Sequence, residues 1–250
     1  MKKIFHLLVA AALIGTAGCT KDSDFLNVQP ASILTNEQAF SDQSQVLSIL
    51  ADLYNQQLDF SGLDNSWASF ADFSESFPSD NGAANIVQRN EWGFDEWRTW
   101  DYGYIRDLNL FIERATEAKA LSETDRTRFL AEARFLRANF YFEMVKRMGG
   151  VPLITQSLLY DFSGDPVYLQ YSRAKEQEMY DFVISEAEAI KNNLPVDPNE
   201  KSRATKAAVL AMEARAALYA GSIARYGANT PQVTLPGQEV GIPASMATGS

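Results

Sequence analysis

Histidine and cysteine are nearly absent from this chain of 250 residues, which contains only His6 and Cys19. A single cysteine excludes a disulfide within the chain. His6 lies in an N-terminal segment with the features of a secretory signal, so the mature chain is left without histidine. That excludes a zinc site of the usual nitrogen and sulfur ligands, a serine or cysteine nucleophile with a histidine base, and a histidine-ligated haem. Carboxylate, lysine or tyrosine chemistry remains, and no metal or cofactor is expected.

Basic residues are also scarce, with 22 Lys and Arg against 32 Asp and Glu. Removal of the signal changes the formal charge from −10 to about −12, because Lys2 and Lys3 are lost with it. No cluster of basic residues remains to neutralise phosphates. Nucleic acids and anionic lipid surfaces are therefore not expected as partners.

Residues 1–18 predict a lipoprotein signal peptide. Two lysines precede an apolar run over residues 4–14, which is too short for a stable membrane span. The sequence TAGC that ends at Cys19 resembles a bacterial lipobox, although a threonine stands where leucine is usual. We expect Cys19 to be lipidated and residues 19–34 to form the lipidated tether. An ordinary secretory signal with a chance cysteine is the alternative.

The sequence EARFLRANFYFEMVKRMGGVPL, residues 132–153, contains the most apolar helical pattern of the chain. Most of the circumference of this predicted helix is apolar, so other elements should cover it on several sides. Arg134 and Arg137 fall within the apolar surface and need a carboxylate, backbone carbonyls or a route to water. We interpret both arginines as structural. Gly149 and Gly150 should end the helix.

Apolar residues at helical spacing recur in four further segments. They predict helices over residues 42–58, from about residue 100 to residue 115, from about residue 172 to residue 195, and from Thr205 to Gly221. Asn109 lies inside an apolar stripe and should hydrogen-bond to a neighbouring turn or loop. The many alanines of the last helix would let a partner helix approach closely. The pattern predicts a mostly all-α fold of stacked antiparallel helix pairs, similar to tetratricopeptide repeats.

Helical periodicity fails between residues 59 and 99, where glycine, serine, asparagine, aspartate and aromatic residues accumulate. A long irregular segment inside a compact domain is usually functional. All four tryptophans of the chain lie between Trp67 and Trp100, with Tyr102 nearby. The segment is therefore the first place to look for a binding site.

Several motifs together resemble the SusD/RagB family of nutrient-binding outer-membrane lipoproteins. They are the lipobox followed by Asp24-Phe25-Leu26 and Pro30, Tyr104-Ile105 with Asn109, the run from Glu132 to Leu153, and Arg203-Ala204-Thr205-Lys206-Ala207-Ala208 followed by Leu218-Tyr219-Ala220-Gly221. The long central run is the most specific of them. Because members of the family are longer, the resemblance implies an N-terminal helical half over residues 35–226, with a loop insertion at 59–99. Residues 227–250 would begin a C-terminal region that the chain does not complete.

The resemblance implies a surface lipoprotein that is anchored in the outer-membrane lipid, faces the exterior and captures glycans or oligopeptides. It would deliver them to a SusC-like TonB-dependent transporter, which is the expected protein partner. The family is not enzymatic.

Sugar rings stack their apolar faces on indole rings, and sugar hydroxyls need polar side chains at the rim of the site. Candidate ligand-binding residues are Trp92 and Trp97, followed by Trp100, with Asp80, Asn81 and Arg89 as hydrogen-bonding partners. The alternative for each tryptophan is a place in the core beneath the loop. Asp80 and Asn81 precede Gly82 and can equally form a turn.

Two other functions fit parts of the sequence. A glycosidase needs two carboxylates and no histidine, and Glu75 with Asp80, or Asp95 with Glu96, are possible pairs. Such pairs also arise by chance in any acidic chain. A helical-repeat scaffold that binds only proteins fits the helices but leaves the tryptophan-rich segment unexplained.

Overall fold

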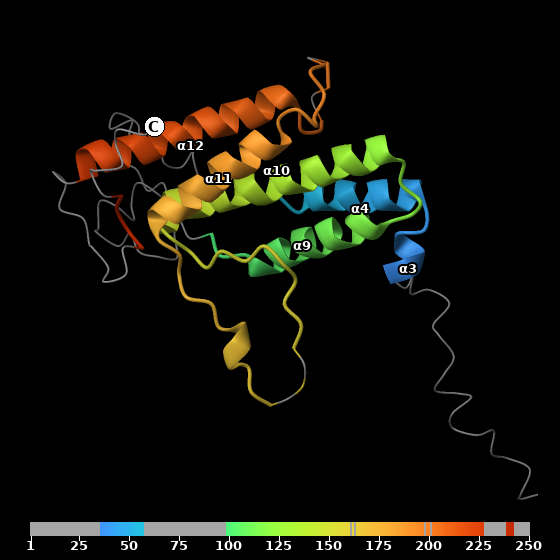
Figure 1. Cartoon of the computed structure of the whole chain (residues 1–250), viewed down its shortest axis with the longest axis horizontal. Coiled ribbons are helices and arrows are strands. Elements are labelled where there is room, and N and C mark those ends of the chain that lie inside the picture. Colours follow the sequence, from blue (N-terminus) through green and yellow to red (C-terminus); the bar gives the residue numbers. More distant parts are fainter. Residues whose placement is uncertain are drawn as a thin grey trace, which may run out of the picture. The chain divides into compact units, whose positions relative to one another are not determined.

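Helices make up the regular secondary structure in the described part of the chain, and no strand occurs there. The computed structural model describes residues 36–57, 99–160, 162, 164–197, 199–200, 202–227 and 239–242, drawn in colour in Figure 1. The chain divides into two units, Met1–Ala39 and Phe40–Ser250. Of the first unit, only the short helix α3 (Asn36–Ala39) is described. The predicted all-α class is confirmed.

The second unit is an array of antiparallel helices. Its described helices are α4 (Gln43–Asn55), α9 (Tyr102–Glu117), α10 (Glu123–Met148), α11 (Glu176–Ile190) and α12 (Lys206–Tyr226), with a 3-10 turn η1 (Val167–Leu169) between α10 and α11. Figure 1 shows α10 in the middle, with α11 and α12 on one side and α9 and α4 on the other. Consecutive helices α9 to α12 each pack against the next, as in a stacked helical repeat.

Polar N-cap residues set where the helices begin. The Asp42 carboxylate accepts hydrogen bonds from the first backbone N–H groups of α4, and Asp101 does the same for α9. Ser122 caps α10 and Thr205 caps α12. Each cap satisfies a donor that the helix leaves without an internal partner, so the starts of these helices are readable from sequence.

Helix α10 is the centre of the core, as its apolar circumference predicts. It packs against α9, α11, α4 and α12. Its aromatic side chains Phe140, Tyr141 and Phe142 are completely buried and point to different neighbours. Phe140 meets Tyr104 of α9 edge to face, and Phe142 meets Tyr180 of α11.

The sequence-based boundaries of α11 and α12 are wrong at their C-terminal ends. α11 ends at Ile190 rather than at Pro195, because residues 191–193 already form a turn. α12 continues through Gly221 to Tyr226. Beyond the glycine, Ala224 is buried against the array, and this packing outweighs the cost of about 1 kcal/mol of a glycine within a helix.

The alanines of α12 are only partly contact residues. Ala216 is completely buried at the helix interface, as expected for a small residue between packed helices. Ala207, Ala211 and Ala214 are exposed instead. By length and mean hydropathy of 1.2, α12 is the one helix in the described ranges that meets the criteria for a membrane span. It nevertheless packs on α11 and α10, and helices of protein cores meet the same criteria.

Gly149 and Gly150 end α10, as predicted, and they also make room for two crossing segments. A Cβ on Gly149 would lie 2.5 Å from the carbonyl oxygen of Glu239, and one on Gly150 would lie 1.8 Å from that of Ala174. Gly149 has a φ of +69°, which glycine tolerates best. The backbone N–H of Gly150 donates to the Glu239 carbonyl at 2.5 Å. Gly149 and Gly150 therefore end the helix and also let the segments at residues 174 and 239 pass close to its C-terminus.

Candidate functional site

Among the predicted ligand-binding residues, Trp100 is the one that lies in the described part of the chain. Trp92, Trp97, Asp80, Asn81 and Arg89 lie outside the described residues, as do the lipidation candidate Cys19 and the carboxylates Glu75, Asp95 and Glu96. Their roles stay predictions. The geometry of the candidate site is therefore built outward from Trp100.

The indole of Trp100 is on the surface. It is 43% exposed and lies edge-on to the ring of Tyr102, with 5.6 Å between the ring centroids. The preceding Thr99 is buried, and the following Asp101 accepts the N–H of Tyr104 at 3.0 Å to cap α9. Because its two neighbours are held in this way, Trp100 is placed at the helix entrance with its ring outside the core. An exposed, positioned indole can stack on an apolar ligand face.

Tyr102 joins Trp100 to the segment that follows α10. Its hydroxyl donates to the carbonyl of Pro152 at 2.7 Å. Burial raises the pKa of the Tyr102 phenol well above its ordinary value, with a further contribution from Tyr141. The phenol therefore keeps its proton and its hydrogen bond at physiological pH.

Residues 151–157 lie along α9 and are held by its polar side chains. The Asn109 amide donates to the carbonyls of Ile154 and Gln156, both at 3.1 Å. The Glu113 carboxylate accepts the backbone N–H of Ser157 at 2.7 Å and its hydroxyl at 2.6 Å. The prediction that Asn109 hydrogen-bonds to a neighbouring loop is confirmed, and the same loop accepts the hydrogen bond of Tyr102.

Arg134 and Arg137 share one carboxylate, Glu186 of α11. Arg134 makes two hydrogen bonds to it at 2.7 and 3.0 Å, and Arg137 makes one at 3.2 Å. Arg137 also donates to the carbonyl of Thr155 at 3.0 Å and to the Asn109 amide oxygen at 2.7 Å. Arg134 thus has a carboxylate partner and Arg137 has a carboxylate and a carbonyl partner, as their position requires.

The charge of Glu186 is stabilised by this arrangement. Burial alone would raise the pKa of the Glu186 carboxyl, but the hydrogen bond from Arg134 and the charges of Arg134 and Arg137 lower it below its ordinary value. The ion pair ties α10 to α11 and, through the hydrogen bond from Arg137 to Thr155, to residues 151–157. The ion pair contributes to the site by holding these segments in place.

A second buried carboxylate, Glu132 of α10, joins three separate segments. Arg203, just before α12, makes two hydrogen bonds to it at 2.7 and 2.9 Å. Arg128, one turn earlier on α10, donates at 2.9 Å, and the Tyr54 hydroxyl of α4 donates at 2.9 Å. Arg128 also pairs with Glu200. Glu132 itself is fully buried, so these donors replace its hydration.

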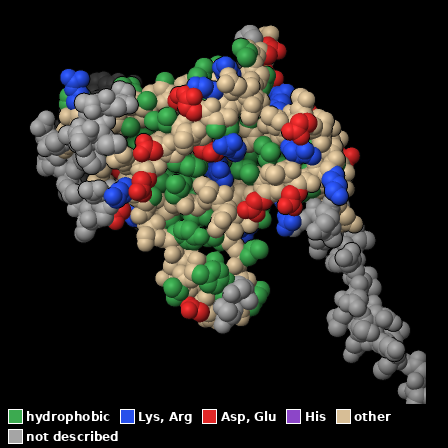
Figure 2. Space-filling model, in the orientation of Figure 1, with side chains coloured by type: hydrophobic (Ala, Val, Ile, Leu, Met, Phe, Trp, Pro, Cys, Tyr) green, Lys and Arg blue, Asp and Glu red, His purple; other side chains and the backbone are tan. Residues whose placement is uncertain are grey.

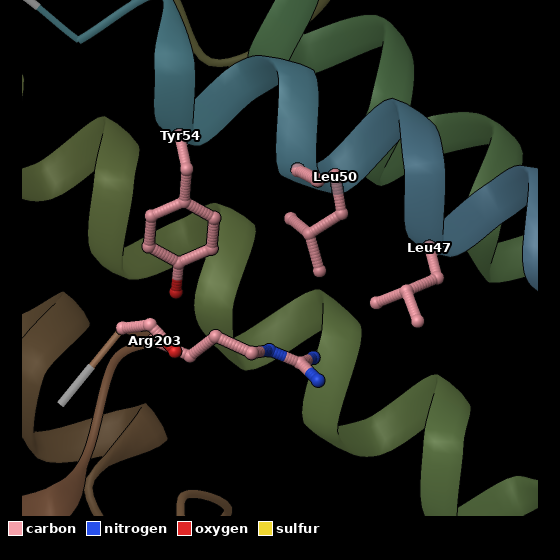
Figure 3. A pocket seen from close by; sticks show the side chains of 6 residues that line it. Leu47, Leu50, Tyr54 and Arg203 are labelled. Carbon is pink, nitrogen blue, oxygen red and sulfur yellow. The ribbon is translucent and has the colours of Figure 1, made fainter. Parts of the chain in front are cut away.

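A cavity of about 390 Å³ lies beside this cluster. Leu47, Leu50, Ala51 and Tyr54 of α4 form one wall, and Ser202 and Arg203 form the other. Figure 3 shows the leucines and the phenol directed from α4 toward Arg203. The volume falls in the range of small-molecule pockets, with an apolar wall and few polar groups.

The chemistry of this cavity favours binding over reaction. Burial, together with the charge of Glu132, raises the pKa of Tyr54 well above its ordinary value, so the phenol keeps its proton. The Tyr54 hydroxyl is already occupied, since it donates to Glu132 and accepts the N–H of Ala204 at 2.8 Å. Arg203 is held by Glu132. A ligand in this cavity would therefore contact an apolar surface, the Ser202 hydroxyl and the edge of the Arg203 guanidinium.

Sequence reasoning did not find this cavity. The apolar stripe of α4 and the segment at Arg203 were both visible, but nothing local indicates that they meet across about 150 residues of chain, as the hydrogen bond from Ala204 to Tyr54 shows. Glu132 falls on the polar stripe of the helix in sequence, so its complete burial, and with it the need for cationic partners, became visible only in the structure. Within the described ranges, no group of three or more His, Cys, Asp or Glu is placed to hold a metal ion.

Comparison with known proteins gives consistent matches. The family described as "Starch-binding associating with outer membrane", SusD-like, matches residues 24–218. The SusD-like protein P38 of Formosa agariphila is 27% identical over 227 residues, which cover 88% of this chain and 43% of P38.

Solved structures agree with this match. A SusD-like protein from Bacteroides fragilis is 28% identical with a TM-score of 0.51, covering 74% of this chain and 36% of that protein. A laminarin-binding SusD-like protein is 20% identical with a TM-score of 0.50, covering 75% of this chain and 42% of that protein. The chain thus spans less than half the length of the proteins it matches.

Proposed function

The chain belongs to the SusD-like family, and from this premise we propose that it captures glycans, or oligopeptides, at the cell surface and delivers them to a SusC-like TonB-dependent outer-membrane transporter. The observation that carries the proposal is the family match over residues 24–218, which includes every long helix up to most of α12. The family description names both starch binding and the outer membrane. A laminarin-binding protein of the same fold supports a glycan over a peptide as ligand.

Trp100 is the described residue that best fits a glycan contact. Its exposed indole adjoins the tryptophan-rich segment at residues 59–99, in which Trp92 and Trp97, with Asp80, Asn81 and Arg89, are proposed to complete the site. The rigid frame of Tyr102, Asn109 and the segment behind them supports the indole. A positioned ring binds without the entropy loss of ordering a mobile one.

We propose that Cys19 is lipidated and anchors the chain in the outer membrane, with residues 1–18 removed and residues 19–34 as the tether. Residues 35–226 would form the helical domain, and residues 227–250 the beginning of a further region. Family membership supports the outer-membrane location.

Ligand binding is tested by affinity electrophoresis and tryptophan fluorescence with laminarin and starch. We expect retardation by at least one of these glycans. Trp100→Ala should weaken the binding roughly threefold to tenfold, because one stacked ring is lost. Tyr226→Ala, which removes an exposed ring at the C-terminal end of α12, is the matched control and should bind as the native chain does.

Two results would contradict the proposal. Absence of binding to a broad panel of glycans and oligopeptides would contradict the proposal that the chain captures them. Release of reducing ends from laminarin or starch at high protein concentration would replace a binding protein by a hydrolase. Unchanged affinity in Trp100→Ala would remove only that residue from the site.

A further inference from the structure

The cavity of about 390 Å³ described above is a second candidate site, because Trp100 is not among its lining residues. Leu50 is almost completely buried. Leu47 is 38% exposed, and Ala51 and Ser202 are exposed as well. The cavity therefore has a buried apolar back and an open side through which a small molecule can enter.

The wall that α4 contributes is apolar because of helical spacing. Leu47, Leu50, Ala51 and Tyr54 recur at intervals of three or four residues, so their side chains share one face of the helix. Figure 3 shows Leu47, Leu50 and Tyr54 directed to the same side. The Tyr54 hydroxyl is occupied by Glu132 and by the backbone of Ala204, so the phenol offers its ring carbons. Such a wall favours an aliphatic group, which removes apolar surface from water.

The Arg203 guanidinium is fixed in place and keeps donors for a ligand. Its Nε and Nη2 donate to the two oxygens of Glu132 at 2.9 and 2.7 Å. The guanidinium carbon lies over the Phe129 ring, 5.3 Å from the centroid. Within the described ranges, Nη1 makes no hydrogen bond, and the Arg203 side chain is 24% exposed. Its two N–H groups are therefore preorganised donors.

The Ser202 hydroxyl is the second polar group of the lining. The residue is exposed, and no described group forms a hydrogen bond with this hydroxyl. A carbonyl oxygen has two lone pairs and can accept from both Ser202 and Arg203. A sugar, in contrast, would leave most of its hydroxyls without a partner against so few polar groups, which is costly.

The charges of the cluster behind the cavity cancel. Arg128 and Arg203 supply two positive charges, and Glu132 and Glu200 supply two negative charges. An anionic head group therefore gains little from a guanidinium that Glu132 already neutralises. Figure 2 shows acidic and basic side chains interspersed on one face of the molecule, and the chain as a whole has a formal charge of −10. Neither the cluster nor the chain attracts anions.

A cationic head group is also disfavoured at this cavity. An ammonium group has only donors, and it would meet the N–H groups of Arg203, which are donors as well. A neutral acceptor satisfies the N–H groups and adds no charge beside Glu132.

We propose that this cavity binds a neutral, mainly aliphatic small molecule, with its alkyl chain against α4 and a carbonyl oxygen that accepts from Nη1 of Arg203 and from the Ser202 hydroxyl. Acyl amides and acyl esters have this chemistry. The site is separate from the proposed glycan contact at Trp100 and does not depend on it.

Isothermal titration calorimetry of the full chain with a series of probes that share one alkyl chain tests the head group. N-methyloctanamide is neutral, octanoate is anionic, and octylamine is protonated at neutral pH. The amide should bind roughly tenfold more tightly than octanoate, and octylamine should bind more weakly still, because the amide alone combines an acceptor with zero charge.

Ala51→Phe tests the place of binding, since a larger side chain on this exposed lining residue fills the cavity from α4. It should weaken amide binding roughly tenfold or more. Gln45→Phe is the matched control. Gln45 is exposed on the same helix but does not line the cavity, so its substitution should leave the amide affinity within about twofold. Ser202→Ala removes one donor and should weaken amide binding roughly threefold.

Helical content and thermal midpoint are compared for all variants, and retardation by laminarin and starch is measured in parallel. Preferential binding of the amide that Ala51→Phe weakens and Gln45→Phe preserves supports the inference. No amide binding by the native chain overturns it, as does equal amide binding by the native chain and Ala51→Phe. Equal losses in Ala51→Phe and Gln45→Phe also overturn it, because the effect is then not local to the cavity.

The remaining outcomes concern the head group and the glycan. Octanoate or octylamine that binds as tightly as the amide overturns the assignment of a neutral ligand. Unchanged amide affinity in Ser202→Ala overturns the placement of the carbonyl. Loss of laminarin or starch binding in Ala51→Phe overturns the inference of a separate site, because the cavity then belongs to the glycan site.

Discussion

At the level of single residues, Glu132 is the most consequential side chain in the described core. It is fully buried and accepts hydrogen bonds from Arg203 and Tyr54, which are distant in sequence, and from Arg128, one turn earlier on α10. A buried carboxylate with several donors contributes little net free energy when intact. Removing it takes away the carboxylate that holds Arg203 and one of the two carboxylates that hold Arg128, and that loss is costly.

We expect Glu132→Ala to lower the free energy of unfolding by about 3 kcal/mol, at the low end for breaking a buried ion pair, because the Arg203 and Arg128 side chains are 24% and 29% exposed and keep part of their hydration. Urea unfolding followed by circular dichroism measures it.

Glu123→Ala on the same helix is the control. Glu123 also pairs with an arginine, Arg126, but its side chain is 82% exposed, so the loss should be under about 1 kcal/mol. Equal losses in the two variants would contradict the distinction between the two ion pairs.

At the level of elements, the connection after α10 depends on the diglycine. Gly149 and Gly164 both have positive φ, +69° and +88°, so alanine suffers a backbone penalty at each. The two differ in their surroundings. A Cβ at Gly149 would collide with the carbonyl of Glu239, whereas at Gly164 nothing lies within 4 Å.

Gly164→Ala should therefore cost about 1 kcal/mol of stability and Gly149→Ala about 3 kcal/mol, since only the second adds a steric collision to the backbone strain. Thermal or urea unfolding of the two variants gives the comparison. If both variants lost the same amount of stability, the close approach of the Glu239 carbonyl to Gly149 would not contribute to the stability of the fold.

The ion pair between α10 and α11 makes stability depend on pH. The pKa of Glu186 is lowered in the folded chain, so the unfolded chain binds the proton more readily. The stabilisation is complete above the ordinary glutamate pKa, 4.5, and is lost as the pH falls through the lower folded value. Glu176, whose pKa is raised by burial, changes in the opposite sense.

The stability difference between the native chain and Glu186→Gln isolates this carboxylate, because Glu176 is common to both. We expect the difference to be constant from pH 7 to about pH 5 and to shrink between about pH 4.5 and pH 3. Unfolding titrations at a series of pH values measure it. A difference that stays constant to pH 3 would show that Glu186 keeps an ordinary pKa.

At the level of the whole molecule, the helical array acts as a platform for irregular segments. α9 and α10 hold residues 151–157, and Asp101 at the start of α9 places Trp100, while the other predicted sugar contacts lie in residues 59–99. Rigid helices with functional loops are a common division of roles in binding proteins. The lipid anchor proposed at Cys19 would keep this platform at the membrane.

Cys19→Ser should move the chain from the membrane fraction to the soluble fraction, because the acyl chains can no longer be attached. Fractionation and labelling with a radioactive or clickable palmitate analogue measure this. Thr16→Leu, which restores the usual lipobox residue, should remain membrane-bound and labelled. Labelling of Cys19→Ser, or its retention in the membrane, would contradict the anchor.

Local pattern was enough to predict much of this protein. The helix start at Thr205, the central position of α10, the end of α10 at Gly149 and the need of Asn109, Arg134 and Arg137 for polar partners all follow from periodicity, capping and burial. The motif at residues 132–153 also indicated the family. These features depend on interactions within a few turns of chain, or on the general cost of burying charge. Both can be inferred from the order of the residues alone.

Only the tertiary structure decided which distant groups meet. It paired Glu132 with Arg203, Arg137 with Glu186, and Gly150 with residues 174 and 239; it extended α12 past Gly221, formed the cavity beside Tyr54, and left Trp100 and Phe162 at the surface. Each depends on how whole helices pack, because a side chain 70 residues away in sequence leaves no mark in the local pattern. Burial and pairing are properties of the assembled array, and they determine which of the candidate residues a ligand can reach.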